Sequence, residues 1–131
     1  MQRSGVSLSS DPDVRDLLID VYIDAEIGRL FGLRNYWLRH TRRPVSHEGP
    51  QLRYHIKTSG LRMAKAIQEI LGPFALTTDS EWGVSDGHIE SHQRSSIVAI
   101  HPGGTTDILK VIMARRIGIG RDIREQAGEL A

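Results

Sequence analysis

The chain has no cysteine among its 131 residues. Without thiols it cannot form a disulfide framework, a thiolate zinc site, an iron–sulfur cluster or a cysteine nucleophile. A protein without cysteine is expected in a reducing compartment, and we predict a cytoplasmic location.

Long apolar runs and an excess of charge are also missing. No stretch approaches the roughly 18 apolar residues of a membrane span, and the opening segment MQRSGVSLSSDPD lacks the apolar run of a secretory signal. The formal net charge is only +1, from 17 basic and 16 acidic side chains. Because a dedicated nucleic-acid binder usually has a strongly basic face, we expect neither a membrane nor a nucleic acid as partner.

Basic residues are nevertheless concentrated in one short segment, which contains Arg34, Arg39, His40, Arg42 and Arg43. Such a cluster can meet phosphate in a nucleic acid or in a nucleotide cofactor. Cations near the C-terminus of a helix also complement its dipole without any partner. The structural interpretation is favoured, and nucleic-acid binding through these arginines is the weakest of the alternatives.

Helical periodicity is what the chain does contain. Apolar spacing and helix-ending residues define four segments, at about 12–40, 50–71, 90–100 and 105–117. Asp11 is expected to cap the first and Thr105 or Thr106 the last. We predict an all-α fold, an antiparallel up-and-down bundle of four helices over residues 11–120. A flexible arm (1–10) precedes it and a polar tail (121–131) follows it.

The first helical segment has apolar residues on two sides. One stripe runs from Val14 through Leu18 and Tyr22, and the other contains Ile23, Ile27 and Leu30. One hairpin neighbour cannot cover both stripes. We therefore expect the chain to form a homo-oligomer or to join a larger subunit.

A metal site at His88, Glu90 and His92 is not predicted. Alternate residues face one way only on a strand, and this segment has no strand-like alternation of apolar residues.

The most informative stretch is residues 94–117, where a helix is followed by the turn His101-Pro-Gly-Gly-Thr105 and a second helix. Unpaired amides at a helix N-terminus attract phosphate, and glycines let a ligand approach the backbone. A tight turn between packed helices would have the same sequence pattern, so both interpretations stay open on physical grounds.

The same stretch resembles the end of flavin-dependent acyl-CoA dehydrogenases of the bacterial type. Their last helix opens with Gly-Thr-x-(Glu/Gln)-Ile and continues into Ile-Ala-Arg. Here the matching residues are 104–108, GTTDI, and 112–115, IMAR. Residues 66–73, AIQEILGP, resemble the Gln-Ile-Leu-Gly-Gly end of the preceding long helix in that family.

The resemblance implies FAD as cofactor and α,β-desaturation of an acyl-CoA as the reaction. It implies that this chain contributes part of the flavin-diphosphate pocket and a subunit interface, with acyl-CoA bound only in the complete assembly. The implied cofactor-binding residues are Gly103, Gly104 and Thr105, followed by Gly72, Asp107 and Glu69.

Departures from the family pattern limit that expectation. Many members place a catalytic Glu immediately before the Gly-Thr turn, where this chain has Gly103, so we predict no catalytic residue in it. Glu69 replaces a Gln that contacts the cofactor, and a carboxylate would repel a diphosphate. The N-terminal helical domain and the middle β-domain of the family have no counterpart in this sequence. The alternative is a non-catalytic helical dimerisation or interaction module derived from that family.

Overall fold

The computed structural model describes residues 2–3, 6–78 and 81–119, and these residues are mostly helical. The long elements are α1 (Pro12–His40), α2 (Glu48–Leu71), α3 (His88–Val98) and α4 (Thr106–Arg116). Their bounds lie close to the predicted ones, and the predicted all-α class is confirmed.

Short elements connect or precede these helices. They are the two-residue antiparallel strands β1 (Gln2–Arg3) and β2 (Val6–Ser7) and the 3-10 helices η1 (Leu8–Ser10), η2 (Gly72–Leu76) and η3 (Val84–Gly87). Strand β2 and helix η1 thus lie in the segment predicted as a flexible arm. The predicted polar tail, 121–131, lies outside the described residues.

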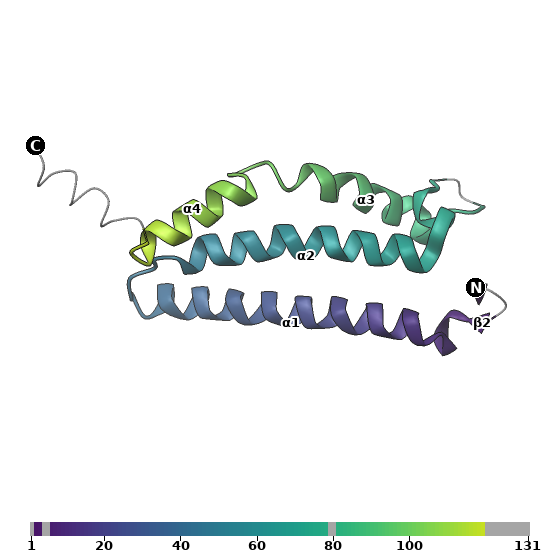
Figure 1. Cartoon of the computed structure of the whole chain (residues 1–131), viewed down its shortest axis with the longest axis horizontal. Helices are drawn as coiled ribbons and strands as arrows, with labels where there is room; N and C mark the ends of the chain where they lie inside the picture. Colours follow the sequence, from purple (N-terminus) through teal and green to yellow (C-terminus); the bar gives the residue numbers. More distant parts are fainter. Residues whose placement is uncertain (1, 4–5, 79–80, 120–131) are drawn as a thin grey trace, which may run out of the picture.

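The helices are arranged in three layers rather than around one common core. Helix α1 packs on one side of α2, while α3 and α4 follow one another along the other side (Figure 1). The predicted antiparallel up-and-down arrangement of the four helices is therefore not confirmed. The reason is length: α3 and α4 have 11 residues each, so together they cover the 24 residues of α2.

Local capping fixes the ends of two helices as predicted. The Asp11 carboxylate accepts from the Asp13 amide at 3.0 Å, and Pro12 takes the first helical position of α1. Thr105 Oγ1 accepts from the Ile108 amide at 3.3 Å at the start of α4.

Glu48 anchors the start of α2 against α1. Its buried carboxylate accepts from the Ser46 amide at 2.9 Å and from Arg34 at 3.3 Å, while its carbonyl accepts from the Asn35 side-chain amide at 3.1 Å. Backbone amides at the helix N-terminus, its own first, hold the pKa of Glu48 below its ordinary value. One of the clustered arginines thus has a structural partner.

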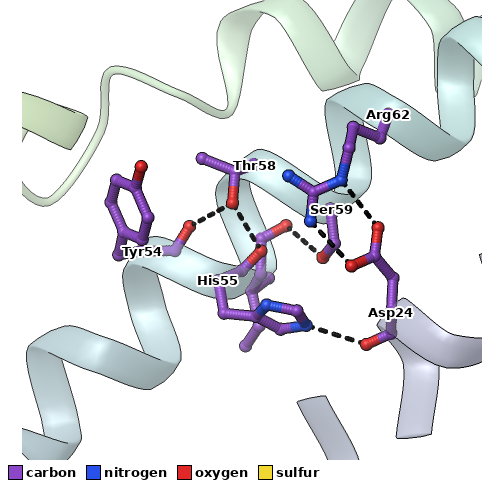
Figure 2. Close-up of polar contacts among 7 residues, drawn as sticks. Asp24, Tyr54, His55, Thr58, Ser59 and Arg62 are labelled. Atoms are coloured by element: carbon purple, nitrogen blue, oxygen red, sulfur yellow. Dashed lines mark hydrogen bonds and ion pairs between the residues drawn. The ribbon is translucent and has the colours of Figure 1, made fainter. Parts of the chain in front are cut away.

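A second polar link joins the middle of α1 to α2 (Figure 2). Arg62 donates Nε to Asp24 Oδ2 at 2.8 Å and Nη2 to Oδ1 at 2.7 Å. His55 Nε2 donates to the Asp24 carbonyl at 2.8 Å, and its ring lies edge-on to Phe31. The hydrogen bond from Arg62 holds the pKa of Asp24 below its ordinary value. Side-chain pairing therefore fixes the register of the hairpin.

The hydrophobic core is thin. In the described part of the chain, no large side chain is fully buried, and the buried apolar residues are mostly small: Val14, Leu38, Ala64, Ala66, Ala75 and Leu109. Because the helices form three layers, with α2 in the middle, the outer faces of α1, α3 and α4 are exposed to solvent. Of these helices, α1 carries the most exposed large apolar side chains.

Candidate functional site

The glycine turn singled out in the sequence lies over the middle of α2. Gly103 and Gly104 have φ of +70° and +97°, a conformation that side chains rarely adopt. A Cβ on Gly103 would also lie 3.4 Å from Arg53 Nη1. These two positions therefore require glycine for backbone reasons, whatever the turn binds.

Lys57 of α2 holds this turn in place. Its Nζ donates to the carbonyl oxygens of Ile100 at 3.1 Å, Pro102 at 2.6 Å and Gly104 at 2.8 Å. The residue is buried, at 8% exposure, and the ammonium group uses all three of its donors. Beside it, Arg53 Nη1 donates to the Gly103 carbonyl at 3.0 Å.

These bonds determine where the amides of the turn point. All peptide bonds of the described residues are trans, so each N–H points opposite to the carbonyl of the same peptide group. With the carbonyls of Pro102, Gly103 and Gly104 directed at α2, the amides of Gly103, Gly104 and Thr105 point away from it. An outward row of amides beside the N-terminus of α4 suits an anion.

Asp107 lies beside these amides but is turned to solvent. Its side chain is 84% exposed and pairs with Lys110 at 3.2 Å. The hydrogen bond that Lys110 donates to Asp107, followed by the field of Tyr54, raises the pKa of Lys110. Asp107 thus has its own counter-ion and lies two residues after Thr105.

Glu69 and Gly72 lie apart from the turn. Gly72 follows the last residue of α2, and Glu69 belongs to a hollow between α2 and α1 lined also by Asp20, Asp24 and Arg62. From Lys57 to Glu69 is 12 residues, or about 18 Å along the helix. A single chain therefore does not bring the six predicted cofactor-binding residues into one site; four of them meet at the α3–α4 turn.

A groove of about 1010 Å³ runs beside the turn, between α1, α2 and α4. Gly103 is the only predicted site residue that lines it. Three arginines from three different helices also line it: Arg39, Arg53 and Arg116. Its apolar floor includes Leu52, Ile56 and Gly60 of α2.

The groove cations are residues that sequence reasoning mostly missed. Arg39 belonged to the basic cluster, but Arg53, Lys57 and Arg116 were passed over. The available signal was the pair at positions 53 and 57, which places two cations one turn apart along the apolar stripe of α2. A charged side chain next to an apolar stripe must either reach solvent or hydrogen-bond to an acceptor. Here the acceptors for Arg53 and Lys57 are the carbonyl oxygens of the α3–α4 turn.

The rest of the basic cluster has structural surroundings. Arg43 lies over the Trp37 ring, with its guanidinium carbon 4.6 Å from the ring centroid, and Arg34 pairs with Glu48. Both contacts fit the structural interpretation, in which these cations lie at the C-terminal end of a helix and need no external partner.

His88, Glu90 and His92 lie on α3, a helix and not a strand, so Glu90 points away from the side that carries the two histidines. Glu90 pairs with Arg94 at 2.8 Å. Over residues 2–3, 6–78 and 81–119, no three potential metal-ligating side chains gather at one point. Within the same ranges, no helix is both long and apolar enough to cross a membrane.

Comparison with known families agrees with these features. The family model described as the acyl-CoA dehydrogenase C-terminal domain matches residues 1–118 of the chain. Because the match includes α1 to α4 and the turn between the last two, this chain belongs to the acyl-CoA dehydrogenase C-terminal domain family. No curated protein and no solved structure gives a significant match.

Proposed function

We propose that this chain is the flavin-contacting C-terminal part of an FAD-dependent acyl-CoA dehydrogenase, working together with domains that enclose the acyl-CoA. The observation that carries the proposal is the α3–α4 turn, whose carbonyls Lys57 and Arg53 hold against α2. This arrangement leaves the amides of Gly104 and Thr105 directed outward, ready to bind an anion.

The residues around the turn fit a dinucleotide with a diphosphate. Outward amides and the Thr105 hydroxyl suit phosphate oxygens, and the guanidiniums of Arg39, Arg53 and Arg116 suit a second anionic group in the groove. The groove volume is at the upper end of the usual range for ligand sites. When bound, FAD supplies the hydride acceptor for α,β-desaturation of an acyl-CoA thioester.

This chain's own part in that reaction is binding and orientation. Gly103 occupies the position at which many family members carry the catalytic Glu, and glycine has no group that can accept a proton. Glu69 is about 18 Å from Lys57 along α2 and does not share the site with Thr105. The proton acceptor is therefore expected to come from another chain or domain. The absence of cysteine supports a cytoplasmic location for the assembly.

A matched pair of arginines on α4 tests the proposal. Arg116 lines the groove, whereas its neighbour Arg115 does not. In fluorescence titrations of FAD with the purified chain, Arg116→Gln is expected to weaken binding about tenfold, the loss of one charge-assisted contact. Arg115→Gln is expected to leave the affinity within about twofold.

Equal affinity for the two variants and the original chain, or no FAD binding by any of them, would contradict the flavin role. The second candidate would then stand, a non-catalytic helical module that associates through its surface. The observation that favours it is the exposed apolar face of α1.

A further inference from the structure

The groove between α1, α2 and α4 carries positive charge and no negative charge. Of the described residues that line it, four are cationic and none is acidic. Lys57 uses its donors on carbonyl oxygens, and Arg53 and Arg116 each donate to a backbone carbonyl. The Arg39 guanidinium has no hydrogen-bond or ion-pair partner among residues 2–3, 6–78 and 81–119. The groove therefore favours an anionic ligand.

Asn35 adds an unsatisfied acceptor to the same groove. The residue is 7% exposed, and its buried Oδ1 atom accepts no hydrogen bond from the described residues. Its Nδ2 donates to the carbonyls of Phe31 at 2.9 Å and Glu48 at 3.1 Å, so exchanging the two amide atoms would set an oxygen against two carbonyls. A buried acceptor without a donor is destabilising, and a ligand N–H in the groove would satisfy it.

The floor of the groove is apolar and open. Leu52, Ile56 and Gly60 follow one another at four-residue intervals along α2, and Ile56 is 57% exposed. A Cβ on Gly60 would meet nothing within 4 Å. From Leu52 to Gly60 the floor extends about 12 Å along the helix, which is room for an acyl chain of medium length.

The cations, the acceptor and the floor follow one another in a fixed order. Arg39 lies one helical turn after Asn35, nearer to the connection between α1 and α2. Arg116 donates to the carbonyl of Ser46 in that connection. Ser46 is two residues from Glu48, whose carbonyl accepts from Asn35, and two residues of chain span about 7 Å at most. The order from the connection inward is therefore cation, acceptor and apolar floor.

We infer that the groove binds an N-acylated amino acid, which presents a carboxylate, an amide N–H and an apolar acyl chain in this same order. The carboxylate pairs with Arg39 and Arg116, since guanidiniums bind carboxylates through parallel N–H···O bonds. The amide N–H donates to Asn35 Oδ1, and the chain lies along the floor. This inference goes beyond the proposed function, because the ligand occupies the groove and needs no flavin at the α3–α4 turn.

The same head group occurs at the C-terminus of a peptide, and the floor decides between the two sources. A peptide continues with further N–H and C=O groups, whereas Leu52, Ile56 and Gly60 offer no polar side chain. The backbone groups of a peptide would lose water there without gaining hydrogen-bond partners. The floor therefore favours an acyl chain.

Three matched ligands test the inference on the original chain. N-decanoylglycine is titrated into the purified chain by isothermal titration calorimetry, with FAD absent. O-decanoylglycolate, in which an ester oxygen replaces the N–H, should bind about tenfold more weakly or worse, because an oxygen then faces Asn35 Oδ1. N-decanoylglycinamide lacks the carboxylate and should lose about as much affinity. Equal affinity for the amide and the ester, or no binding of N-decanoylglycine, would overturn the inference.

Matched variants test the two ends of the site. Arg39→Gln should weaken binding of N-decanoylglycine about tenfold, whereas Arg42→Gln, which changes a nearby arginine outside the groove, should leave it within about twofold. Gly60→Leu fills the far end of the floor and should also weaken binding about tenfold. Its open surroundings and better helix propensity preserve the fold, which circular dichroism checks. Equal effects of the two arginine substitutions, or full affinity in folded Gly60→Leu, would contradict the site.

A peptide distinguishes the two sources of the head group. N-acetyl-leucyl-leucyl-glycine should bind more weakly than N-decanoylglycine, and tighter binding of the peptide would overturn the acyl chain as the occupant of the floor. Because these titrations contain no FAD, their failure leaves the flavin role untouched. A chain that binds N-decanoylglycine but no FAD would lose the proposed function and keep the groove site.

Discussion

Lys57 Nζ lies 2.8 Å from the carbonyl oxygen of Gly104, a residue 47 positions later in the chain. The same ammonium group holds the carbonyls of Ile100 and Pro102, so one side chain of α2 fixes both the end of α3 and the turn into α4. This contact explains why α3 and α4 stay in line along α2. It also relates the fold to the proposed site, because it turns the amides outward.

Replacing Lys57 with Met is expected to destabilise the chain by about 2–4 kcal/mol, because three carbonyls lose a charged donor and apolar packing cannot replace it. Urea denaturation followed by circular dichroism measures the loss. Lys65→Met is the control, since Lys65 is exposed on the same helix, and its effect should stay within about 0.5 kcal/mol. Equal effects of the two substitutions would show that Lys57 does not hold the turn.

Glycines of the helices and of the turn should respond in opposite ways to alanine. A Cβ on Gly32 or Gly60 meets nothing within 4 Å, and both lie in helix interiors. Alanine at either position should stabilise the chain by about 0.5–1 kcal/mol through helix propensity. Gly104→Ala should instead destabilise it by about 1–2 kcal/mol, because its φ of +97° suits glycine alone. Thermal melts of the three variants give the sign of each effect.

The ends of the helices could be predicted from sequence, because a cap depends on neighbouring residues. Asp11 and Thr105 each bind an amide two or three residues away, within the range of a local pattern. The arrangement of the helices could not be predicted in the same way. It depends on Lys57 reaching carbonyls 43–47 residues away, a contact that no periodicity of the apolar residues records.

The surface of α1 was predicted in part. Sequence periodicity indicated two apolar sides, and the structure assigns Leu18 and Tyr22 to the outer side although they had been grouped with Val14, which is buried. A stripe defined by three- and four-residue spacing is wide enough to include residues of both sides. Only the position of α2 separates them, and that position depends on long-range contacts such as Asp24 with Arg62.

The ion pair of Asp24 and Arg62 should give a small, acid-sensitive part of the stability. The hydrogen bond from Arg62 lowers the pKa of Asp24 below 3.8 in the folded chain, so the contribution is present above that pH. It is lost as the pH falls through the lower, folded-state pKa. The difference in unfolding free energy between the original chain and Asp24→Asn should be up to about 1 kcal/mol at pH 7, because Arg62 is largely exposed.

Urea titrations of both proteins between pH 7 and pH 2.5 measure this difference. It should shrink only below about pH 4, where the unfolded-state carboxyl begins to take up protons. A difference that grows on acidification, or one already absent at pH 7, would contradict the assignment of the ion pair.

The chain by itself should not oxidise an acyl-CoA. Gly103 offers no proton acceptor at the position where many family members place the base, and the role we propose for the other five predicted residues is cofactor binding. The purified chain, supplied with FAD, an artificial electron acceptor and acyl-CoAs of several lengths, should reduce no acceptor above a protein-free control. Turnover in this assay would show that a base lies elsewhere in the chain.

Thr105 separates the binding role of the turn from its structural role. Its hydroxyl caps α4 by accepting from the Ile108 amide, so Thr105→Ala should cost about 1 kcal/mol of stability whether or not a flavin binds. If the hydroxyl also donates to a diphosphate, the variant should lose a further 0.5–1.5 kcal/mol, about two- to tenfold, in FAD affinity.

Thr105→Ser keeps the hydroxyl and should retain both properties. Paired thermal melts and FAD titrations of the two variants distinguish the roles. A lowered melting temperature with unchanged FAD affinity in Thr105→Ala would mean that the turn caps and connects helices without touching the diphosphate, and the anion would then have to lie against the groove arginines alone.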